Sequence, residues 1–285
     1  MYVLYSPCIV NPALRADGIT KPVDLDLFER CIERCKRFGI EMVPLPCPET
    51  LHLGPSRKPG TFLERLNTQE FASLIDKLVV QVEDIIVERG PPLCILGVNS
   101  SPTCGVTSTF YGSVDQQPPK RMIRGVFLAR FPKIKATDVM TFSQYRVYLA
   151  APLFSEAERD YNLLIARNLR NNFFDVFLPQ EAGDDSHIRH KEEQARIFSE
   201  NLKALEKSDI VVAVIDGADA DSGTAWEMGY AYAQGKQVIA LRTDFRRVGI
   251  YEKVNLMLEQ SASSVTNLDT LLNLLKSQMI CDFIR

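Results

Sequence analysis

The chain has 285 residues, of which 46% are apolar, and this is enough material for a sizeable core in each of two compact domains. Its formal net charge is -3, and lysine and arginine residues are interspersed with aspartate and glutamate. The sequence therefore lacks the basic patch that polyanion binding needs, and we expect no nucleic acid partner. Small molecules remain open as partners.

The sequence predicts a cytoplasmic protein that does not contact membranes. No apolar run approaches the roughly 20 residues of a membrane span, and the first residues, MYVLYSPCIVNP, lack the basic region and cleavage pattern of a signal peptide. In the cytoplasm the seven cysteines are expected to be thiols, metal ligands or cluster ligands rather than disulfides.

In the first half of the chain, apolar strands alternate with helices. Strands are predicted over residues 2–5, 40–45 and 93–98, and helices over about 24–38 and 69–89. The segment 52–67 is basic and loop-like. This alternation predicts an α/β domain in which a parallel-type sheet has helices on both faces.

Each of the three predicted strands ends beside a cysteine and a proline. The motifs are Ser6-Pro7-Cys8, Pro46-Cys47-Pro48-Glu49 and Ser101-Pro102-Thr103-Cys104-Gly105. Because the carboxyl ends of parallel strands share one edge of a sheet, these cysteines could converge although they are far apart in sequence. Three converging thiolates can hold a metal or an iron–sulfur cluster with one open corner. Spacing alone is weak evidence for such a site, because no pair forms a C-x-x-C motif.

These motifs, together with Arg124-Gly125-Val126-Phe127, resemble the thiouracil desulfidase family over residues 1–132. Members of that family hold a 4Fe-4S cluster by three such cysteines, and its open iron accepts sulfur from a thiolated base. The resemblance implies that Cys8, Cys47 and Cys104 are cluster ligands. It also implies Glu49 and Ser101 as candidates for proton transfer and substrate positioning. From the residues alone, Glu49 could equally be a solvated loop residue.

Residues 133–144 have mixed polarity and no clear period, so we expect a domain linker there, with a second domain over residues 145–285. The second domain repeats the alternation. Strands are predicted over residues 146–151, 174–178, 210–215 and 237–242, and helices over about 156–171, 192–207 and 222–235. The pattern predicts a parallel sheet of the flavodoxin or Rossmann type.

Six residues of types that often bind metals are expected to have no such role. Four cysteines lie on a helix face, inside a strand or in an apolar tail, where a free cysteine is usually a small hydrophobe, and two histidines lie in a polar loop without a well-spaced third ligand. They are Cys31, Cys35, Cys94, Cys281, His187 and His190.

The stretch from Asp209 to Gly235 is predicted to form a buried strand, a carboxylate-rich loop and a helix. Glu227 is expected in the first turn of that helix, where unpaired amides and the helix dipole favour its ionised form. A carboxylate held there, at the rim of a sheet, could act as a nucleophile. Alternatively, Thr224 and Glu227 could form a capping box, which would make Glu227 structural.

The strand 210–215, the segment DSGTAWEMGYAYAQGK and the strand after it resemble the nucleoside 2-deoxyribosyltransferase family. In that family the pattern Asp-x-Gly-x-x-x-Glu-x-Gly-Tyr-Ala carries the active site; Asp221, Gly223, Glu227 and Gly229 match it, and Gly235 follows at the end of the helix. The resemblance implies that Glu227 forms a glycosyl-enzyme ester. It implies that Asp221 contacts the base and assists its departure.

The same resemblance implies further residues of the site. Tyr148 corresponds to a tyrosine near the nucleophile, and Asn201 lies where some members have a second base-binding aspartate. Asn255 and Met257 resemble an Asn-x-Met segment that reaches into a neighbouring subunit's site, so we expect a homo-oligomer. From the residues alone, Tyr148 could be ordinary strand packing and Asn255 a helix cap.

The sequence thus predicts an enzyme of nucleoside and nucleobase salvage. The second domain would cleave or exchange the N-glycosidic bond of deoxynucleosides, and the first would remove sulfur from a thiolated base with a 4Fe-4S cluster. Two alternatives stay open for the second domain. It could be a deoxynucleoside 5′-monophosphate N-glycosidase that holds phosphate with Ser155 and Arg159, or a nucleotide sensor without turnover. Base and sugar preference, and transfer versus hydrolysis, are left open.

Overall fold

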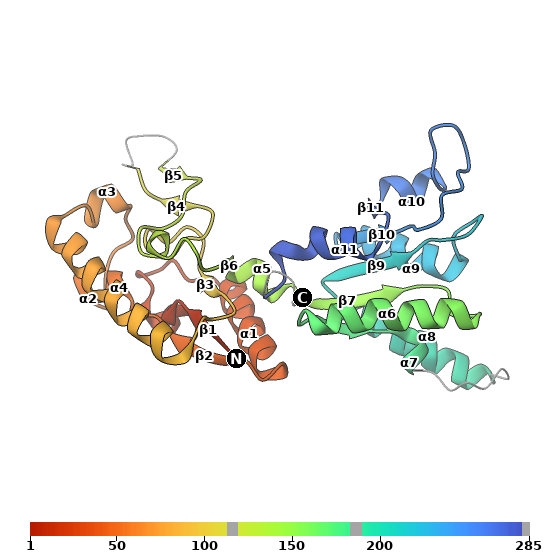
Figure 1. Cartoon of the computed structure of the whole chain (residues 1–285), viewed down its shortest axis with the longest axis horizontal. Coiled ribbons are helices and arrows are strands. Elements are labelled where there is room, and N and C mark those ends of the chain that lie inside the picture. Colours follow the sequence, from red (N-terminus) through yellow and green to blue (C-terminus); the bar gives the residue numbers. More distant parts are fainter. Residues whose placement is uncertain (113–118, 183–189, 281–285) are drawn as a thin grey trace. The chain divides into compact units, whose positions relative to one another are not determined.

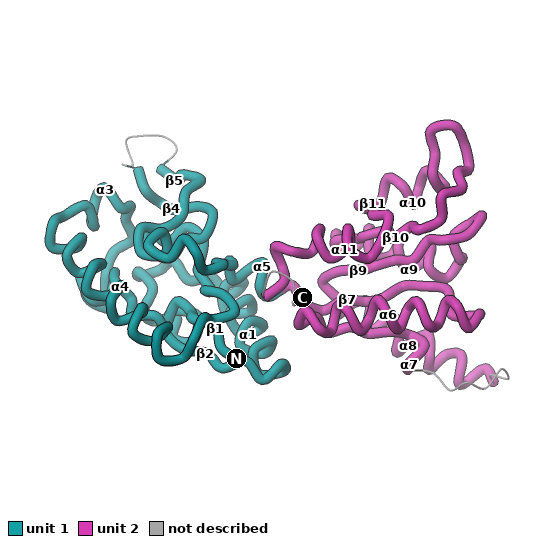
Figure 2. The backbone as a smooth tube through the Cα atoms, in the orientation of Figure 1, with its two compact units in different colours: residues 1–143 teal, residues 144–285 magenta. Residues whose placement is uncertain are grey.

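The computed structural model describes residues 1–112, 119–182 and 190–280. The chain forms two compact units, residues 1–143 (unit 1) and residues 144–285 (unit 2) (Figure 2). Each unit has its own parallel sheet with helices packed against it (Figure 1). The predicted α/β fold class is therefore confirmed. None of the helices in the described ranges is long and apolar enough to cross a membrane.

The sheet of unit 1 has the strand order β2-β1-β3-β6, and neighbouring strands run parallel. The strands are β1 (Tyr2–Tyr5), β2 (Glu41–Pro44), β3 (Ile95–Gly97) and β6 (Ala136–Asp138). All four residues of β1 are buried, as an uninterrupted apolar run requires of a central strand. Because β2 and β3 lie on opposite sides of β1, the carboxyl end of β1 is the switch point at which doubly wound sheets bind ligands.

Two long helices cover the sheet of unit 1. They are α1 (Pro22–Arg37) and α4 (Gln69–Arg89). Three shorter helices are α2 (Pro48–Leu53), α3 (Phe62–Arg65) and α5 (Val139–Ser143). The strands β4 (Thr109–Phe110) and β5 (Lys120–Arg121) form an antiparallel pair. Thr68 caps α4 by accepting a hydrogen bond from Phe71 N, and Gly90 follows its last residue. Phe71 and Ile75 of α4 share one buried cluster with Leu4 of β1.

Two expectations for unit 1 need correction. The loop-like segment 52–67 contains α3 and the end of α2. The expected linker, residues 133–144, contains β6 and α5 instead. β6 pairs with β3, and the fully buried Arg34 donates a hydrogen bond of 2.9 Å to Phe142 O in α5. The sequence analysis did not predict β6 or α5. Elements of three to five residues are too short for a period in the hydrophobic pattern to be visible.

The sheet of unit 2 has the strand order β11-β10-β9-β7-β8, all parallel. The strands are β7 (Arg146–Ala150), β8 (Asp175–Phe177), β9 (Ile210–Val214), β10 (Gln237–Leu241) and β11 (Ser263–Val265). Taken in chain order within the unit, this is the flavodoxin arrangement, with its switch point between β7 and β9. β9 is central and entirely buried, as its β-branched sequence predicts. β11 was not predicted.

The helices of unit 2 place loops and side chains at the carboxyl edge of this sheet. They are α6 (Glu156–Asn171), α7 (Pro179–Ala182), α8 (Lys191–Lys207), α9 (Ser222–Ala233), α10 (Leu256–Gln260) and α11 (Leu268–Leu274). α9 contacts β9 and β10 and buries Met228 and Ala231 against them. It ends before Gly235, whose φ of +70° reverses the chain in a conformation that favours glycine.

Candidate active sites

In unit 1 the three predicted cluster ligands lie at the carboxyl ends of three neighbouring strands. Cys8 lies in the 3-10 turn Pro7–Ile9 after β1, Cys47 is the residue before α2, and Cys104 lies in the loop after β3. All three are free thiols. Burial raises the pKa of Cys8, and the neighbouring Cys104 and Cys47 raise it further. Burial and the neighbouring Cys47 raise the pKa of Cys104 to about 12.

This thiol group has the donor chemistry of a cluster site. In the described ranges, no group of three His, Cys, Asp or Glu side chains is arranged to hold a single metal ion. A 4Fe-4S cluster sets a different iron against each thiolate, so its ligands lie further apart than those of one ion. The Ser6 hydroxyl is buried beside Cys104 and lowers the pKa of that thiol through a hydrogen bond, against the larger effect of burial. Three free thiols at the ends of neighbouring strands are the donor set that fits a cluster with one open corner.

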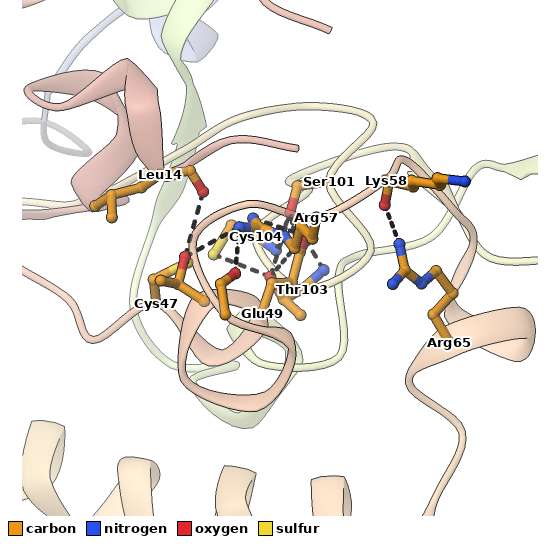
Figure 3. Close-up of polar contacts among 11 residues, drawn as sticks. Leu14, Cys47, Glu49, Arg57, Lys58, Arg65, Ser101, Thr103 and Cys104 are labelled. Atoms are coloured by element: carbon orange, nitrogen blue, oxygen red, sulfur yellow. Dashed lines mark hydrogen bonds and ion pairs between the residues drawn. The ribbon is translucent and has the colours of Figure 1, made fainter. Parts of the chain in front are cut away.

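Glu49 and Ser101 are in direct contact beside the thiols (Figure 3). Ser101 Oγ donates a hydrogen bond of 2.9 Å to Glu49 Oε1, and Thr103 Oγ1 donates one of 2.8 Å to the same oxygen. The Glu49 side chain is only 15% exposed, so the solvated-loop alternative does not describe it. Ser101 Oγ also accepts a hydrogen bond from Cys104 N, which ties this pair to a thiol-bearing loop.

The loop after β3 owes its shape to close backbone packing. A Cβ atom on Gly97 would lie 2.4 Å from Cys104 O, so only glycine fits there. Asn99 Oδ1 accepts hydrogen bonds from three successive backbone amides, those of Val106, Thr107 and Ser108. Ser100 has a φ of +76°, a strained value for a residue with a side chain. These features hold Ser101 and Cys104 in fixed positions.

Sequence reasoning missed two residues of this group. Thr103 lies between Ser101 and Cys104 and donates a hydrogen bond to Glu49. Its place inside the cysteine motif is the only sequence signal for this contact. Arg57 is buried and donates a hydrogen bond of 3.4 Å from Nη2 to Glu49 Oε2, although the sequence placed it in a basic loop. Nothing in the sequence around Arg57 signals that its side chain turns inward.

In unit 2 the central contact joins Glu227 to Tyr148. Tyr148 is fully buried on β7, and its hydroxyl donates a hydrogen bond of 2.5 Å to Glu227 Oε1. Asp221 is the N-cap of α9 and accepts a 2.9 Å hydrogen bond from Thr224 N. Because α9 begins at Ser222, Glu227 lies in the second turn and not the first. The capping-box alternative is therefore wrong, and Glu227 instead contacts Tyr148 and lines a pocket.

The electrostatics of Glu227 differ from the sequence expectation. Burial raises its pKa to about 7, the hydrogen bond from Tyr148 lowers it, and the charge of Asp221 raises it. Desolvation therefore outweighs any benefit from the helix start, which lies more than a turn away. Burial and the nearby Glu227 charge raise the pKa of Tyr148, so its hydroxyl stays protonated and remains a donor. Both forms of Glu227 are accessible near neutral pH.

A pocket of about 300 Å³ opens beside this contact. Four of the predicted residues line it, together with four apolar side chains; the eight are Tyr148, Asn201, Gly223, Glu227, Phe198, Leu202, Leu205 and Trp226. The rings of Phe198 and Trp226 lie 6.0 Å apart and are each about half exposed. Sequence reasoning assigned neither Trp226 nor Phe198 to the site, because half-exposed aromatic residues on helices give no distinct pattern.

The remaining predicted residues do not line this pocket. Asn255 Oδ1 accepts a hydrogen bond from Met257 N, so Asn255 caps α10, as one of the two alternatives held. Met257 is 75% exposed. Ser155 caps α6, and Arg159 Nη1 donates to the carbonyl oxygens of Leu153 and Phe154. These contacts hold the start of α6 and the turn before it.

Four of the six residues that were expected to bind no metal lie in the described ranges. Cys31, Cys35 and Cys94 are buried free thiols, and His190 is exposed before α8. Cys281 and His187 lie outside the described residues.

Comparison with known protein families finds a match in each unit. Residues 3–175 match a family model described as "Putative 2-thiouracil desulfurase", which covers more than half of the chain. The chain belongs to this family. Residues 147–274 match the model of the nucleoside 2-deoxyribosyltransferase family, which spans most of unit 2. Both predicted resemblances are confirmed, and both families are enzymes. The two matches overlap over residues 147–175, so the desulfurase match continues from unit 1 into β7, α6 and β8.

Individual relatives are distant. An uncharacterized protein of Ureaplasma parvum is 31% identical over 115 residues, which is 35% of this chain and 72% of that protein. A 2-deoxyribosyltransferase structure from Bacillus psychrosaccharolyticus is 24% identical with a TM-score of 0.41, covering 48% of this chain and 99% of its own. A 4Fe-4S-dependent thiouracil desulfidase structure is 16% identical with a TM-score of 0.33, covering 48% of this chain and 89% of its own.

Proposed function

We propose that unit 2 cleaves or exchanges the N-glycosidic bond of a deoxynucleoside, with Glu227 as the nucleophile. The observation that carries the proposal is the hydrogen bond from the buried Tyr148 to Glu227 in the lining of a pocket large enough for a small ligand. An ionised carboxylate oxygen attacks C1′ of the sugar, the C1′–N bond breaks, and its electron pair leaves with the base. The product is a glycosyl ester on Glu227.

Neighbouring residues would divide the remaining tasks. Tyr148 occupies Glu227 Oε1, which leaves Oε2 to attack C1′. Asp221, whose charge reaches Glu227, would contact the base and assist the protonation of its leaving nitrogen. Asn201 lines the pocket and offers an amide to the base edge. Attack of a second base on the ester gives transfer, and attack of water gives hydrolysis.

We propose that unit 1 removes sulfur from a thiolated nucleobase. Cys8, Cys47 and Cys104 would hold a 4Fe-4S cluster, which when bound supplies an open iron for the sulfur of the base. In the net reaction a C=S group and water give a C=O group and hydrogen sulfide, so no oxidant or reductant is required. Ser101 and Glu49, joined by a hydrogen bond, would take and return the proton of the incoming water.

We propose that the protein is a cytoplasmic homo-oligomer. Asn255 and Met257 lie outside the pocket lining of their own chain, which agrees with a role in a neighbouring site. The segment from β10 to α10 also exposes large apolar side chains, with Phe245 94%, Ile250 82% and Tyr251 92% exposed. Exposed apolar groups this close together are typical of an interaction surface.

The two alternatives for unit 2 have less support. The nucleotide N-glycosidase would need Ser155 or Arg159 for phosphate, and both make structural contacts. A sensor without turnover would not need a carboxylate whose pKa lies near 7 beside the pocket.

The test of the unit 2 proposal is Glu227→Gln, with deoxynucleosides and free bases as substrates and chromatography of the products. We expect turnover to fall by about 10³-fold or more, because an amide cannot form the ester. Glu206→Gln is the matched control, since Glu206 also accepts a hydrogen bond from a tyrosine, Tyr230, but lies outside the pocket. Near-normal turnover by Glu227→Gln would remove the nucleophile assignment, and tight nucleoside binding by an inactive wild type would favour the sensor.

A further inference from the structure

One arginine contacts both the proposed proton-handling residue of unit 1 and the neighbour of a proposed ligand. Arg57 is 6% exposed, and its Nη2 lies 3.4 Å from Glu49 Oε2. Its Nη1 donates a hydrogen bond of 3.1 Å to Thr50 Oγ1 and a longer one of 3.4 Å to Gly54 O. Figure 3 shows Arg57 in the same group of side chains as Cys47, Glu49 and Cys104.

The Glu49 carboxylate is held from two sides. Ser101 and Thr103 donate to Oε1, and Arg57 faces Oε2. The side chains of Arg57 and Glu49 are 4% and 15% exposed, so water and salt screen this ion pair much less than a pair on the surface. The arginine therefore helps to hold the Glu49 carboxylate in the orientation in which one of its oxygens accepts from Ser101.

The Thr50 hydroxyl has one hydrogen and two acceptors within reach. Cys47 Sγ lies 3.1 Å from Thr50 Oγ1, and Leu14 O lies 3.3 Å from it. Because Arg57 donates to the Thr50 oxygen, the hydroxyl hydrogen must point away from the guanidinium, toward one of these two. An ionised or iron-bound sulfur is a charge-assisted acceptor and would take the hydrogen in preference to a carbonyl.

We propose that Arg57 is a positioning residue of the unit 1 site. A single guanidinium orients the Glu49 carboxylate toward Ser101 and directs the Thr50 hydroxyl onto the Cys47 sulfur. The task suits arginine rather than lysine, because the planar fork reaches two acceptors in fixed directions and an ammonium does not. This inference rests on the proposed desulfidase function, and it adds a link between proton transfer and the sulfur of one cluster ligand.

A purely structural role for Arg57 is the competing explanation. Arg57 O accepts a hydrogen bond from Asp17 N, and the side chain contacts Gly54 O, so the residue also ties two loops together. A structural role predicts loss of folding stability without a specific effect on the cluster. A positioning role predicts a defect in turnover and in the properties of the cluster while the chain remains folded.

The first experiment compares Arg57→Lys and Arg57→Gln with the wild-type chain after anaerobic reconstitution, with 2-thiouracil as the probe substrate. We expect iron and sulfide content to remain near the wild-type level, because the three cysteines are unchanged. The kcat should fall by about 10- to 100-fold, as for residues that orient metal ligands, while KM changes little. Lys58→Gln is the control, since Lys58 is the neighbouring cation and is exposed.

The second experiment measures the midpoint potential of the cluster, which depends on hydrogen bonds to its sulfurs. Thr50→Val removes the hydroxyl with little change of shape. It should shift the potential in the wild-type background and have little further effect in the Arg57→Gln background, because both changes act through the same hydrogen bond. Thermal unfolding of each apoprotein monitors the fold independently of the cluster.

Each outcome decides the inference. Retention of wild-type kcat by both Arg57 variants, or additive shifts of the potential in the double variant, overturns the positioning role while the desulfidase proposal stands. Loss of folded apoprotein in Arg57→Lys as well as Arg57→Gln gives the structural explanation instead. A wild-type chain that binds no cluster, or releases no sulfide from 2-thiouracil, overturns the desulfidase proposal and this inference with it.

Discussion

At the residue scale, the charge of Glu227 is set by three neighbours acting in different directions. Burial in the pocket raises its pKa, Asp221 raises it further, and the Tyr148 hydroxyl opposes both. A nucleophilic carboxylate must be ionised before it attacks, so the tyrosine increases the reactive fraction near neutral pH. The desolvation that raises the pKa also makes the ionised oxygen a better nucleophile, because less water surrounds it.

This balance predicts the pH dependence of unit 2. The pKa of Glu227 is about 7, so kcat/KM for deoxynucleoside cleavage should rise with pH through that value as the carboxyl group loses its proton. Tyr148→Phe removes the contact that lowers this pKa. The inflection should therefore move upward by about one pH unit, since one pH unit corresponds to about 1.4 kcal/mol and a hydrogen bond to a charged group contributes that much. A profile that stays in place, or moves to lower pH, would contradict the assigned role of Tyr148.

At the element scale, the start of α9 combines a structural and a chemical task in one side chain. Asp221 caps the helix through Thr224 N, and its charge also acts on Glu227 one and a half turns further along. The sequence suggested Thr224 as the N-cap residue of α9, with Glu227 as its partner in a capping box. In the structure the N-cap residue is Asp221, three residues earlier, so Glu227 lies in the second helical turn and lines the pocket. Glu227 is therefore available for chemistry and is not needed as a capping partner.

The two tasks of Asp221 can be separated by substitution. Asp221→Asn keeps an oxygen that accepts from Thr224 N, so the free energy of unfolding should change little, whereas Asp221→Ala should lose about 1 kcal/mol with the cap. Both variants should lose turnover, because neither assists the leaving base. Both should also lower the pKa of Glu227, since the charge that raises it is gone. Urea unfolding and pH profiles of the two variants check this; full activity in Asp221→Asn would leave the residue with only its capping role.

The sequence predicted most of the elements that position the sites but not the contacts inside them. The apolar runs ending at Cys8, Cys47 and Cys104 imply a parallel sheet, and its topology places these residues at one edge whatever the details of packing. The inward turn of Arg57 depends on tertiary contacts with Glu49 and Thr50, to which no local pattern corresponds. The same applies to the raised pKa of Glu227, which arises from burial under residues far away in sequence.

At the scale of the whole molecule, one chain combines two doubly wound units whose proposed sites both act on nucleobase compounds. In each unit the proposed site lies at the carboxyl edge of the sheet, near the switch point. Unit 1 gathers thiols there, and unit 2 gathers a carboxylate, a phenol and an apolar pocket wall. A base released by unit 2 belongs to the same chemical class as the proposed substrate of unit 1.

The cluster proposal makes a direct prediction for the full chain. Anaerobically prepared protein should be brown and contain about four iron atoms per chain, as one 4Fe-4S cluster requires. Cys47→Ala and Cys104→Ala should lose iron and desulfidation together, because each removes a ligand. Cys31→Ala, Cys35→Ala and Cys94→Ala are matched controls, since these buried thiols lie in α1 or just before β3 and not at the carboxyl ends of the strands. Iron and sulfide analysis measures the result, and an unchanged iron content in Cys104→Ala would end the desulfidase interpretation of unit 1.

The oligomer proposal predicts that two inactive variants regain activity when their chains are mixed in one oligomer. If Asn255 completes a neighbouring site, Asn255→Ala and Glu227→Gln should each be inactive alone, yet a mixed oligomer should contain one intact site. That site would take Glu227 from one subunit and Asn255 from the other. For a symmetric dimer with free exchange, half of the molecules would be mixed and half of their sites intact, so about one quarter of the wild-type activity should return.

The control pair for this experiment is Glu227→Gln mixed with Asp221→Ala. Asp221 and Glu227 belong to the same helix, so every site in the mixture lacks one of them and no activity should return. Differently tagged chains purified together establish that mixed oligomers have formed. Recovery with Asn255→Ala but not with Asp221→Ala would place Asn255 in the neighbouring site, because exchange of subunits can repair only a site that two chains share. An absence of recovery in oligomers shown to be mixed, or full activity of Asn255→Ala alone, would reduce Asn255 to the cap of α10 and leave each site to its own chain.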